Sequence, residues 1–227
     1  VSGIGIVSCL MGSRVHKSSP RSFASAESVQ SSIPFELKIA HIHGGETTHG
    51  AIDNIYRHQI TLASTYHFTA AEVFSERVIS IVSSNKNVHT VGSISLEDIG
   101  KLKLPSWNSV KDRFDIPFDD FILVTFHPES VGTSRNKVYA NVVYKTLKLL
   151  IKNHNILVSK ANSDAMGSLF NDCYERLQGE HPRKLKLVSA LGKLNYFKAK
   201  QHCSFMLGNT SSGIIESASF SKYVVNV

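Results

Sequence analysis

Short runs rich in β-branched residues alternate along the chain with longer amphipathic runs, and this alternation limits the folds available to it. From residue 37 onward, strands are expected at 37–42, 66–70, 87–91, 121–126, 156–159, 185–188, 205–207 and 223–227. Helices are expected at 50–64, 71–82, 95–102, 136–152, 164–177, 194–202 and 212–220. Regular strand–helix alternation produces parallel sheets covered by helices. The expected fold class is therefore α/β, with two Rossmann-like parallel-sheet domains.

The pattern also predicts where the domains divide. Residues 1–36 are Ser-rich and weakly patterned, and we expect a divergent, loop-like segment apart from a short strand that 2–10 could form. Residues 37–104 are expected to form a partial N-terminal domain. Residues 105–120 contain two prolines and several acids and are interpreted as a linker. Residues 121–227 are expected to form the C-terminal domain. Ligands of such folds bind outside the carboxyl ends of the strands, here in an expected cleft between the domains.

Charge and composition narrow the class of ligand. The formal charge of +7 favours an anionic partner, but the basic residues are dispersed, which favours a small phosphorylated ligand over nucleic acid. The sequence has no apolar run of 18 residues and no secretory signal pattern, so neither a membrane partner nor export is expected. Three scattered cysteines indicate free thiols, and a cytoplasmic location is expected. No metal or cofactor is expected.

The strand at 205–207 runs into a turn of small residues that begins a helix. Unpaired backbone N–H groups at a helix start favour negative charge, and small side chains allow a diphosphate to approach them. A carboxylate one turn later could accept hydrogen bonds from ribose hydroxyls. Ordinary capping by Thr210 is the alternative. The residues predicted to bind a nucleotide diphosphate are Asn209, Ser211, Ser212, Gly213 and Glu216.

A histidine, His127, follows the strand at 121–126 and precedes Pro128. Residues at this end of a parallel strand are expected to face the ligand. The histidine could be structural or functional, and the nearby predicted phosphate site favours a functional role.

A third cluster follows the strand at 37–42. His41 and His43 alternate on that strand and therefore share one face. Two glycines, Gly44 and Gly45, permit a sharp turn that presents Glu46. A metal site is the alternative interpretation because His-x-His is a ligand spacing, but no further ligand motif accompanies it.

The helix after this turn carries two more charged residues. Asp53 and Arg57 are four positions apart, so their side chains lie on one side of the helix and could pair. Together with Glu46 they provide two carboxylates and an arginine, a combination suited to general acid–base catalysis.

Several of these motifs together resemble the hydrolysing UDP-N-acetylglucosamine 2-epimerases of bacterial sialic acid pathways. The similar segments are His41-Ile42-His43-Gly44-Gly45-Glu46, Asp53-x-x-x-Arg57-His58, Val91-Gly92, Thr125-Phe126-His127-Pro128 and Gly208–Glu216, and they follow in the family's order over residues 38–227. The resemblance implies a glycosyltransferase-B arrangement and a UDP-sugar substrate. It implies elimination of UDP to a glycal, followed by hydration to N-acetylmannosamine.

The resemblance also implies roles for individual residues. Glu46 and Asp53 match acid–base residues, whereas Arg57 and His127 match residues that support the site and the departing diphosphate. The family's initial strand and Gly-Thr-Arg loop have no counterpart, and Met11-Gly12-Ser13-Arg14 has Ser13 where the family has an acid. The family also continues through another loop and helices after the position of Val227. The chain is therefore expected to be truncated at both ends, with an incomplete N-terminal domain and a UDP-binding C-terminal domain that is incomplete at its end.

The sequence leaves two other functions open. A UDP-sugar glycosyltransferase of the same architecture would also bind UDP at a helix start, but it would not need the cluster at Glu46 and Asp53. A non-catalytic remnant that still binds UDP is the other alternative. Assembly into a homo-oligomer is a further expectation.

Overall fold

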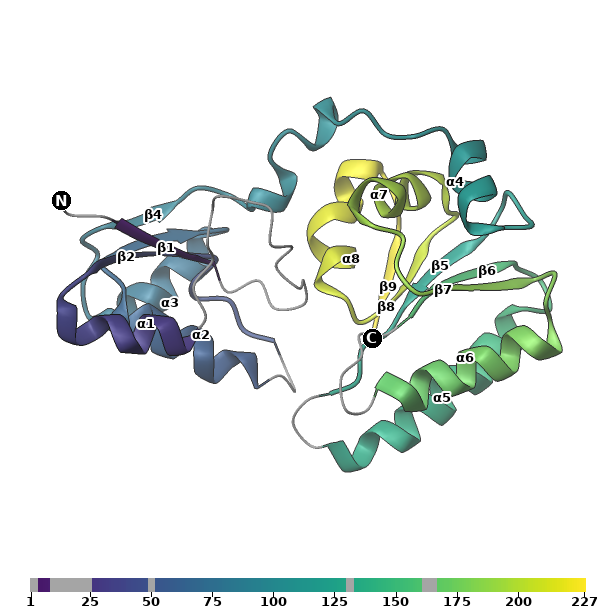
Figure 1. Ribbon diagram of the computed structural model, residues 1–227, viewed down its shortest axis with the longest axis horizontal. Coiled ribbons are helices and arrows are strands. Elements are labelled where there is room, and N and C mark those ends of the chain that lie inside the picture. Colours follow the sequence, from purple (N-terminus) through teal and green to yellow (C-terminus); the bar gives the residue numbers. More distant parts are fainter. Residues whose placement is uncertain (1–3, 9–25, 49–51, 130–132, 161–166) are drawn as a thin grey trace. The chain divides into compact units, whose positions relative to one another are not determined.

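A computed structural model describes residues 4–8, 26–48, 52–129, 133–160 and 167–227 (Figure 1). The chain divides into two compact units at Ile94 and Ser95, and each unit has its own parallel sheet. The strands expected from residue 37 onward are all present, with ends within one residue of the expected positions. The expected starts of two helices, at 50 and 164, and the segment Met11–Arg14 lie outside the described residues.

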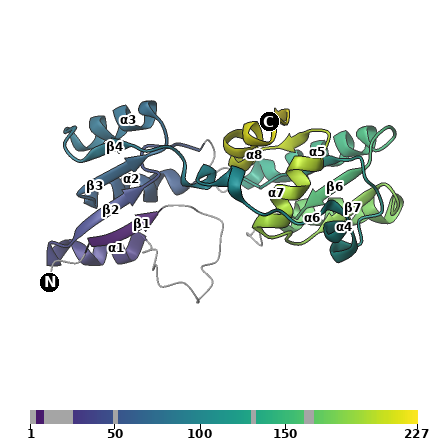
Figure 2. The same cartoon turned by 90° about the horizontal axis from the view of Figure 1, so that it is seen from above.

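The first unit is a sheet of four strands that are parallel and follow one another in chain order. Figure 2 shows them side by side: β1 (Ile4–Ser8), β2 (Lys38–Ile42), β3 (Tyr66–Thr69) and β4 (Val88–Thr90). Helices α1 (Ala26–Ser32), α2 (Asp53–Ala63) and α3 (Glu72–Val82) connect them. Helix α2 packs against both α1 and α3. Strand β1 falls within the short strand expected at 2–10.

Helix α1 corrects the prediction of a loop-like segment up to residue 36. Its Val29 is buried and packs with Ile39 of β2 and Ile60 of α2. The Ser-rich composition conceals this helix, because its stability comes from tertiary packing of Ala26 and Val29 against the rest of the unit. A 3-10 turn, Ile33–Phe35, follows the helix.

The second unit is a parallel sheet of five strands in the order β7-β6-β5-β8-β9. These strands are β5 (Ile122–Thr125), β6 (Ile156–Ser159), β7 (Leu185–Val188), β8 (Met206–Gly208) and β9 (Val224–Asn226). Figure 1 shows α5 (Asn136–Leu150) and α6 (Gly167–Glu180) on one face, and α7 (Lys193–His202) and α8 (Ser211–Glu216) on the other. The chain order reverses between β5 and β8, which is where open α/β sheets bind ligands.

The expected linker at 105–120 is instead part of the second unit's core. It contains helix α4 (Trp107–Phe114), which Ser106 caps by accepting a hydrogen bond from the Ser109 N–H. The Trp107 ring stacks on Phe121 and His202 at centroid distances of 5.0 and 4.6 Å. Prolines and acids are common in linkers, and here they flank the buried indole of Trp107. Composition alone therefore suggests a linker, whereas packing of the indole stabilises a helix. The helix expected at 95–102 consists of two 3-10 turns, Ile94–Leu96 and Ile99–Lys101.

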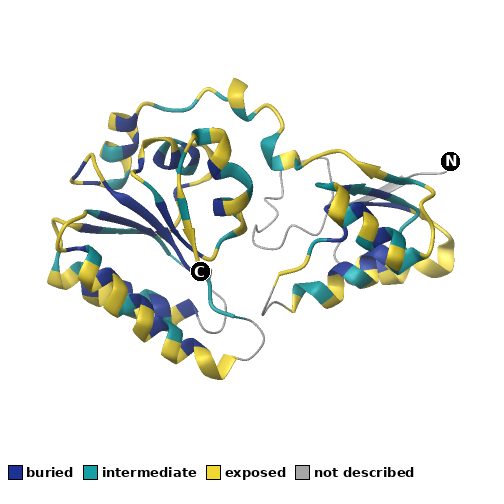
Figure 3. Ribbon diagram, turned by 180° about the vertical axis from the view of Figure 1, so that it is seen from behind, coloured by how far each residue is buried: buried dark blue, intermediate teal, exposed yellow. Residues whose placement is uncertain are grey.

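The core of the second unit lies on both faces of its sheet. All four residues of β5 are buried, and Figure 3 shows the central strands in dark blue beneath helices whose outer faces are exposed. Burial on both faces explains why the sequences of these strands are continuous apolar runs. None of the helices in the described part of the chain is long and apolar enough to cross a membrane.

Candidate functional site

The carboxyl ends of β5 and β8 lie next to each other where the strand order reverses. Thr125 of β5 pairs in register with Gly208 of β8. A Cβ atom at Gly208 would collide with the carbonyl group of Thr125, so this position accepts only glycine. The close approach brings together His127 and Asn209, two residues predicted from the sequence to belong to the site.

Asn209 binds the backbone of His127 with both polar atoms of its amide. Its Oδ1 accepts the His127 N–H at 2.8 Å, and its Nδ2 donates to the His127 carbonyl at 2.8 Å. The prediction placed Asn209 among nucleotide ligands. In the structure its amide joins the loops that follow β5 and β8, and its contact with a nucleotide stays a prediction.

Asn136, at the start of α5, holds the same loop two residues further on. Its Oδ1 accepts the Glu129 N–H at 2.9 Å, and its Nδ2 donates to the Glu129 carbonyl at 2.8 Å. The Asn136 side chain is buried. The segment from His127 to Glu129 is therefore fixed at both ends by asparagine side chains, one from the turn after β8 and one from the start of α5. Sequence reasoning missed Asn136, because its partner is set by the loop's conformation.

The turn after β8 begins α8 in the expected way. Thr210 is the N-cap, and its hydroxyl accepts a hydrogen bond from the Ser212 N–H at 3.3 Å. Ser211 is exposed, Ser212 is half-buried and Gly213 is buried. A Cβ atom at Gly213 would lie 3.2 Å from Cγ1 of Val224, so the glycine lets α8 pack closely on β9.

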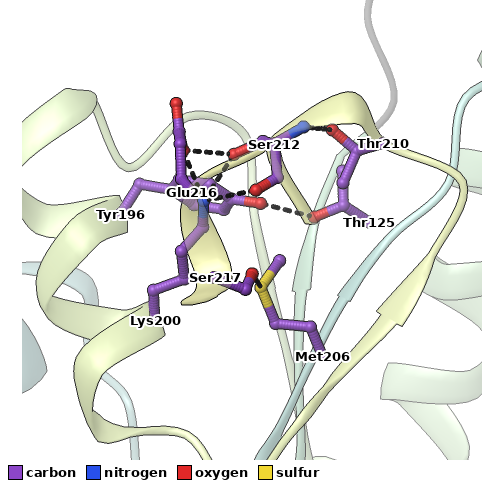
Figure 4. Close-up of polar contacts among 8 residues, drawn as sticks. All are labelled: Thr125, Tyr196, Lys200, Met206, Thr210, Ser212, Glu216 and Ser217. Atoms are coloured by element: carbon purple, nitrogen blue, oxygen red, sulfur yellow. Dashed lines mark hydrogen bonds and ion pairs between the residues drawn. The ribbon is translucent and has the colours of Figure 1, made fainter. Parts of the chain in front are cut away.

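Glu216 ends α8 and meets a buried lysine that sequence reasoning missed. Lys200 of α7 is fully buried, and its Nζ lies 2.5 Å from Oε2 of Glu216 (Figure 4). The same Nζ donates to the carbonyl and the hydroxyl of Ser212 at 3.0 and 2.5 Å. The Ser212 hydroxyl donates in turn to Oε2 of Glu216 at 2.6 Å. Burial lowers the pKa of Lys200, while the Glu216 carboxylate opposes that shift.

No periodic pattern in the sequence marks Lys200, because α7 has no distinct apolar side. Phe197, Ala199 and Lys200 of this helix are buried, and packing of the second unit decides that. A buried lysine needs an acidic partner, because a buried charge is costly unless it is paired.

In the first unit, two arginines hold the turn that presents Glu46. Arg57 of α2 donates to the Glu46 carbonyl at 2.9 Å, and Arg77 of α3 donates to the Gly45 carbonyl at 2.5 Å. Gly45 has a φ of 79°, as the predicted sharp turn requires, and a Cβ atom there would collide with the Phe74 backbone. Arg77 had not been predicted.

The Glu46 side chain is partly exposed, and its Oε1 lies 2.7 Å from Nδ1 of His43. With Glu46 ionised, His43 donates this hydrogen bond and the imidazole fixes the direction of the carboxylate.

Asp53 and Arg57 have a spacing that allows an ion pair, but Arg57 has other partners in the structure. Arg57 bonds the Glu46 carbonyl and, at 3.4 Å, Oδ1 of Asn54. Asp53 is half-buried in the first turn of α2, where an acid is favoured by the helix dipole. The Arg57 guanidinium therefore supports the turn that presents Glu46 and is not held by Asp53.

His41 is buried beneath this turn and stays neutral. Its Nδ1 lies 3.1 Å from Oγ1 of Thr61, and it pairs in register with the buried His67 of β3. Burial, together with His67, Arg57, His43 and His58, lowers the pKa of His41 to about 3. No group of three or more His, Cys, Asp or Glu side chains that could hold a metal occurs in the described ranges.

The fold and these sites define a chain of two α/β units, each with a parallel sheet and with polar residues at the carboxyl ends of its strands. Solved structures share this fold. A UDP-GlcNAc 2-epimerase from Methanocaldococcus jannaschii, in complex with UDP-GlcNAc and UDP, has a TM-score of 0.70 at 14% identity, over 98% of this chain and 59% of that one. A UDP-GlcNAc 2-epimerase from Neisseria meningitidis bound to UDP-GlcNAc also has a TM-score of 0.70 at 14% identity, over 88% and 56%.

Residues 24–227 match the family described as UDP-N-acetylglucosamine 2-epimerase, and the chain belongs to this family. Among curated relatives, a UDP-N,N'-diacetylbacillosamine 2-epimerase (hydrolyzing) from Legionella pneumophila is 31% identical over 86% of this chain and 51% of its own length. A GDP/UDP-N,N'-diacetylbacillosamine 2-epimerase (hydrolyzing) from Campylobacter jejuni is 29% identical over 84% of this chain and 50% of its own. The chain spans about half the length of these relatives.

Proposed function

We propose that the protein takes part in a hydrolysing 2-epimerase reaction on UDP-N-acetylglucosamine or a related UDP-linked 2-acetamido sugar. The observation that carries this proposal is the family match over residues 24–227, which includes both the Glu46 turn and the start of α8. The word "hydrolyzing" in the names of two relatives favours release of the free sugar over a simple epimerisation.

The proposed reaction has two steps. In the first, a base removes the proton from C2, the C1–O bond to the diphosphate breaks, and a C1–C2 double bond forms as UDP leaves. In the second, water adds its hydroxyl to C1 while a proton is delivered to the opposite face of C2. The products are UDP and the free sugar with inverted C2, which is N-acetylmannosamine when the substrate is UDP-N-acetylglucosamine.

Glu46 and Asp53 are the proposed acid–base residues. Both carboxylates belong to the same unit, and Glu46 already has a fixed direction through His43. Arg57 is assigned as a positioning residue for Glu46, because its guanidinium binds the Glu46 carbonyl. A general base must be held within hydrogen-bond reach of the proton that it takes, and this support would provide that precision.

The nucleotide is proposed to bind at the turn between β8 and α8. Ser211, Ser212 and Gly213 would contact the diphosphate through backbone and hydroxyl groups, and Glu216 would accept hydrogen bonds from the ribose. His127 is proposed to assist the departing diphosphate, and Asn209 would position His127 through the backbone contacts already described. Interactions that strengthen as the leaving group gains charge accelerate such a step.

The proposal is tested by incubating the chain with UDP-N-acetylglucosamine, without an acceptor, in deuterated water. We expect release of UDP together with N-acetylmannosamine that carries deuterium at C2. NMR spectroscopy detects both products. Parallel incubations with UDP-N,N'-diacetylbacillosamine identify the preferred sugar, and Glu46→Gln is expected to release far less product from either substrate. UDP release that requires an acceptor sugar would instead show a glycosyltransferase. UDP binding without release from either substrate would show a non-catalytic protein.

A further inference from the structure

We propose that Lys200 is a positioning residue of the nucleotide site, which orients Glu216 so that one carboxylate oxygen is directed to the ribose hydroxyls. The inference rests on the proposed function, because it gives Glu216 a ligand. Lys200 belongs to α7 and lies outside every segment that the sequence analysis assigned to the site.

Lys200 cannot reach a ligand itself. Its side chain is fully buried, and its Nζ has three acceptors within hydrogen-bond distance: the carbonyl and hydroxyl of Ser212 and Oε2 of Glu216. An ammonium group has three protons to donate, so these acceptors can use them all. Any effect of Lys200 on binding must therefore pass through Ser212 or Glu216.

The contacts on Glu216 are asymmetric. Lys200 and the Ser212 hydroxyl both bind Oε2, and neither binds Oε1. Two donors on one oxygen fix the rotation of the carboxylate while leaving the other oxygen as an acceptor. The Glu216 side chain is 13% exposed, so a ligand at the helix start has limited but real access to it.

Aromatic side chains hold Lys200 in this place. Its Nζ lies 4.9 Å from the ring centroid of Tyr196 and 5.5 Å from that of Phe197. The Tyr196 hydroxyl lies 3.5 Å from Oγ1 of Thr125 at the carboxyl end of β5 (Figure 4). The network thus connects α7 and α8 to β5, the strand that leads to His127. It lies where the strand order of the sheet reverses, between β5 and β8.

The test compares UDP with 2′,3′-dideoxyuridine diphosphate by calorimetry on the full chain and on Lys200→Met. The unaltered chain is expected to prefer UDP by about tenfold or more, the value of a charge-assisted hydrogen bond to ribose. Lys200→Met should lose most of this preference while its affinity for the dideoxy analogue stays nearly constant. Lys198→Met, a partly exposed lysine on the same helix, is the matched control and should retain the preference.

A purely structural role would lower the affinity for both nucleotides alike and leave their ratio unchanged. If Lys200→Met does not fold, Lys200→Gln removes the charge while its amide NH2 group can still donate hydrogen bonds, and it provides the same comparison. A ribose preference that stays intact in the folded variant would overturn the role proposed for Lys200 but not the proposed function. Failure of the unaltered chain to bind UDP would overturn the proposed function and this inference together.

Discussion

The Nζ of Lys200 lies 2.5 Å from Oε2 of Glu216, and the two side chains are 0% and 13% exposed. This ion pair joins α7 to the last residue of α8. A charge in such surroundings depends on its partner, because desolvation is compensated only while the pair is intact. The pair therefore bears on the stability of the second unit as well as on the proposed site.

Replacing only one member of this ion pair should lower the stability of the folded protein. Lys200→Met is expected to lower the free energy of unfolding by about 3–5 kcal/mol, because Glu216 is left without its cation. The double variant Lys200→Met with Glu216→Gln should recover part of the loss, since no unpaired charge remains. Urea unfolding followed by circular dichroism measures both. A single variant within about 1 kcal/mol of the parent would show that the pair contributes little.

The Asn209 contacts predict a separation of turnover from nucleotide binding. Asn209→Asp keeps an acceptor for the His127 N–H but places an oxygen against the His127 carbonyl, so the loop should shift. We expect turnover to fall by about tenfold to a hundredfold, the cost of a small misplacement of a catalytic group. The affinity for UDP should change much less.

Steady-state kinetics and UDP calorimetry on the same preparations would distinguish the two roles of Asn209. The exposed Asn153→Asp is the matched control, because the same chemical change there should leave both quantities unaltered. Loss of UDP affinity with intact turnover would favour the prediction that Asn209 is a direct nucleotide ligand.

The carboxylates of the first unit are predicted to act on the sugar. Glu46→Gln and Asp53→Asn keep the side-chain shape and should each reduce turnover by about 10²- to 10⁴-fold, the scale of general acid–base catalysis. UDP affinity should remain close to that of the parent. If Asp53 only favours the first turn of α2, its replacement would cost about 0.3–1 kcal/mol of stability and spare turnover. Near-normal turnover in either variant would remove that residue from the chemistry.

Because His41 is buried, we expect the free energy of unfolding to fall in acid. Burial, together with His67 and other neighbouring basic groups, lowers its pKa from 6.5 to about 3, so the unfolded chain binds a proton that the folded chain does not. The stabilisation is complete above pH 6.5 and is lost as the pH falls towards 3. Within this window the free energy of unfolding should fall by up to about 1.4 kcal/mol per pH unit from this group.

The variant His41→Gln, which does not titrate, isolates this contribution. Urea unfolding at several pH values between 7.5 and 4 should give a shallower pH dependence for the variant than for the parent. The dependence will not vanish, since burial also lowers the pKa values of His67 and His58. Parallel pH profiles would show that His41 titrates normally in the folded protein.

Much of the architecture could be predicted because its signals are local. The apolar runs at 122–125 and 156–159 identify buried parallel strands by their composition. The turn at Gly45 was expected because consecutive glycines permit positive φ. Helices α1 and α4 were missed for the opposite reason: Val29 and Trp107 reveal their helices only through partners elsewhere in the chain.

The sequence by itself determined the α/β class, the strand positions and the residues that reach the carboxyl ends of the strands, since backbone periodicity and turn chemistry act over a few residues. Tertiary structure alone decided what those residues contact. It directed Arg57 to the Glu46 carbonyl, Asn209 to the His127 backbone and Lys200 to Glu216. Each contact joins groups from different elements, and its geometry exists only after the sheet has brought those elements together.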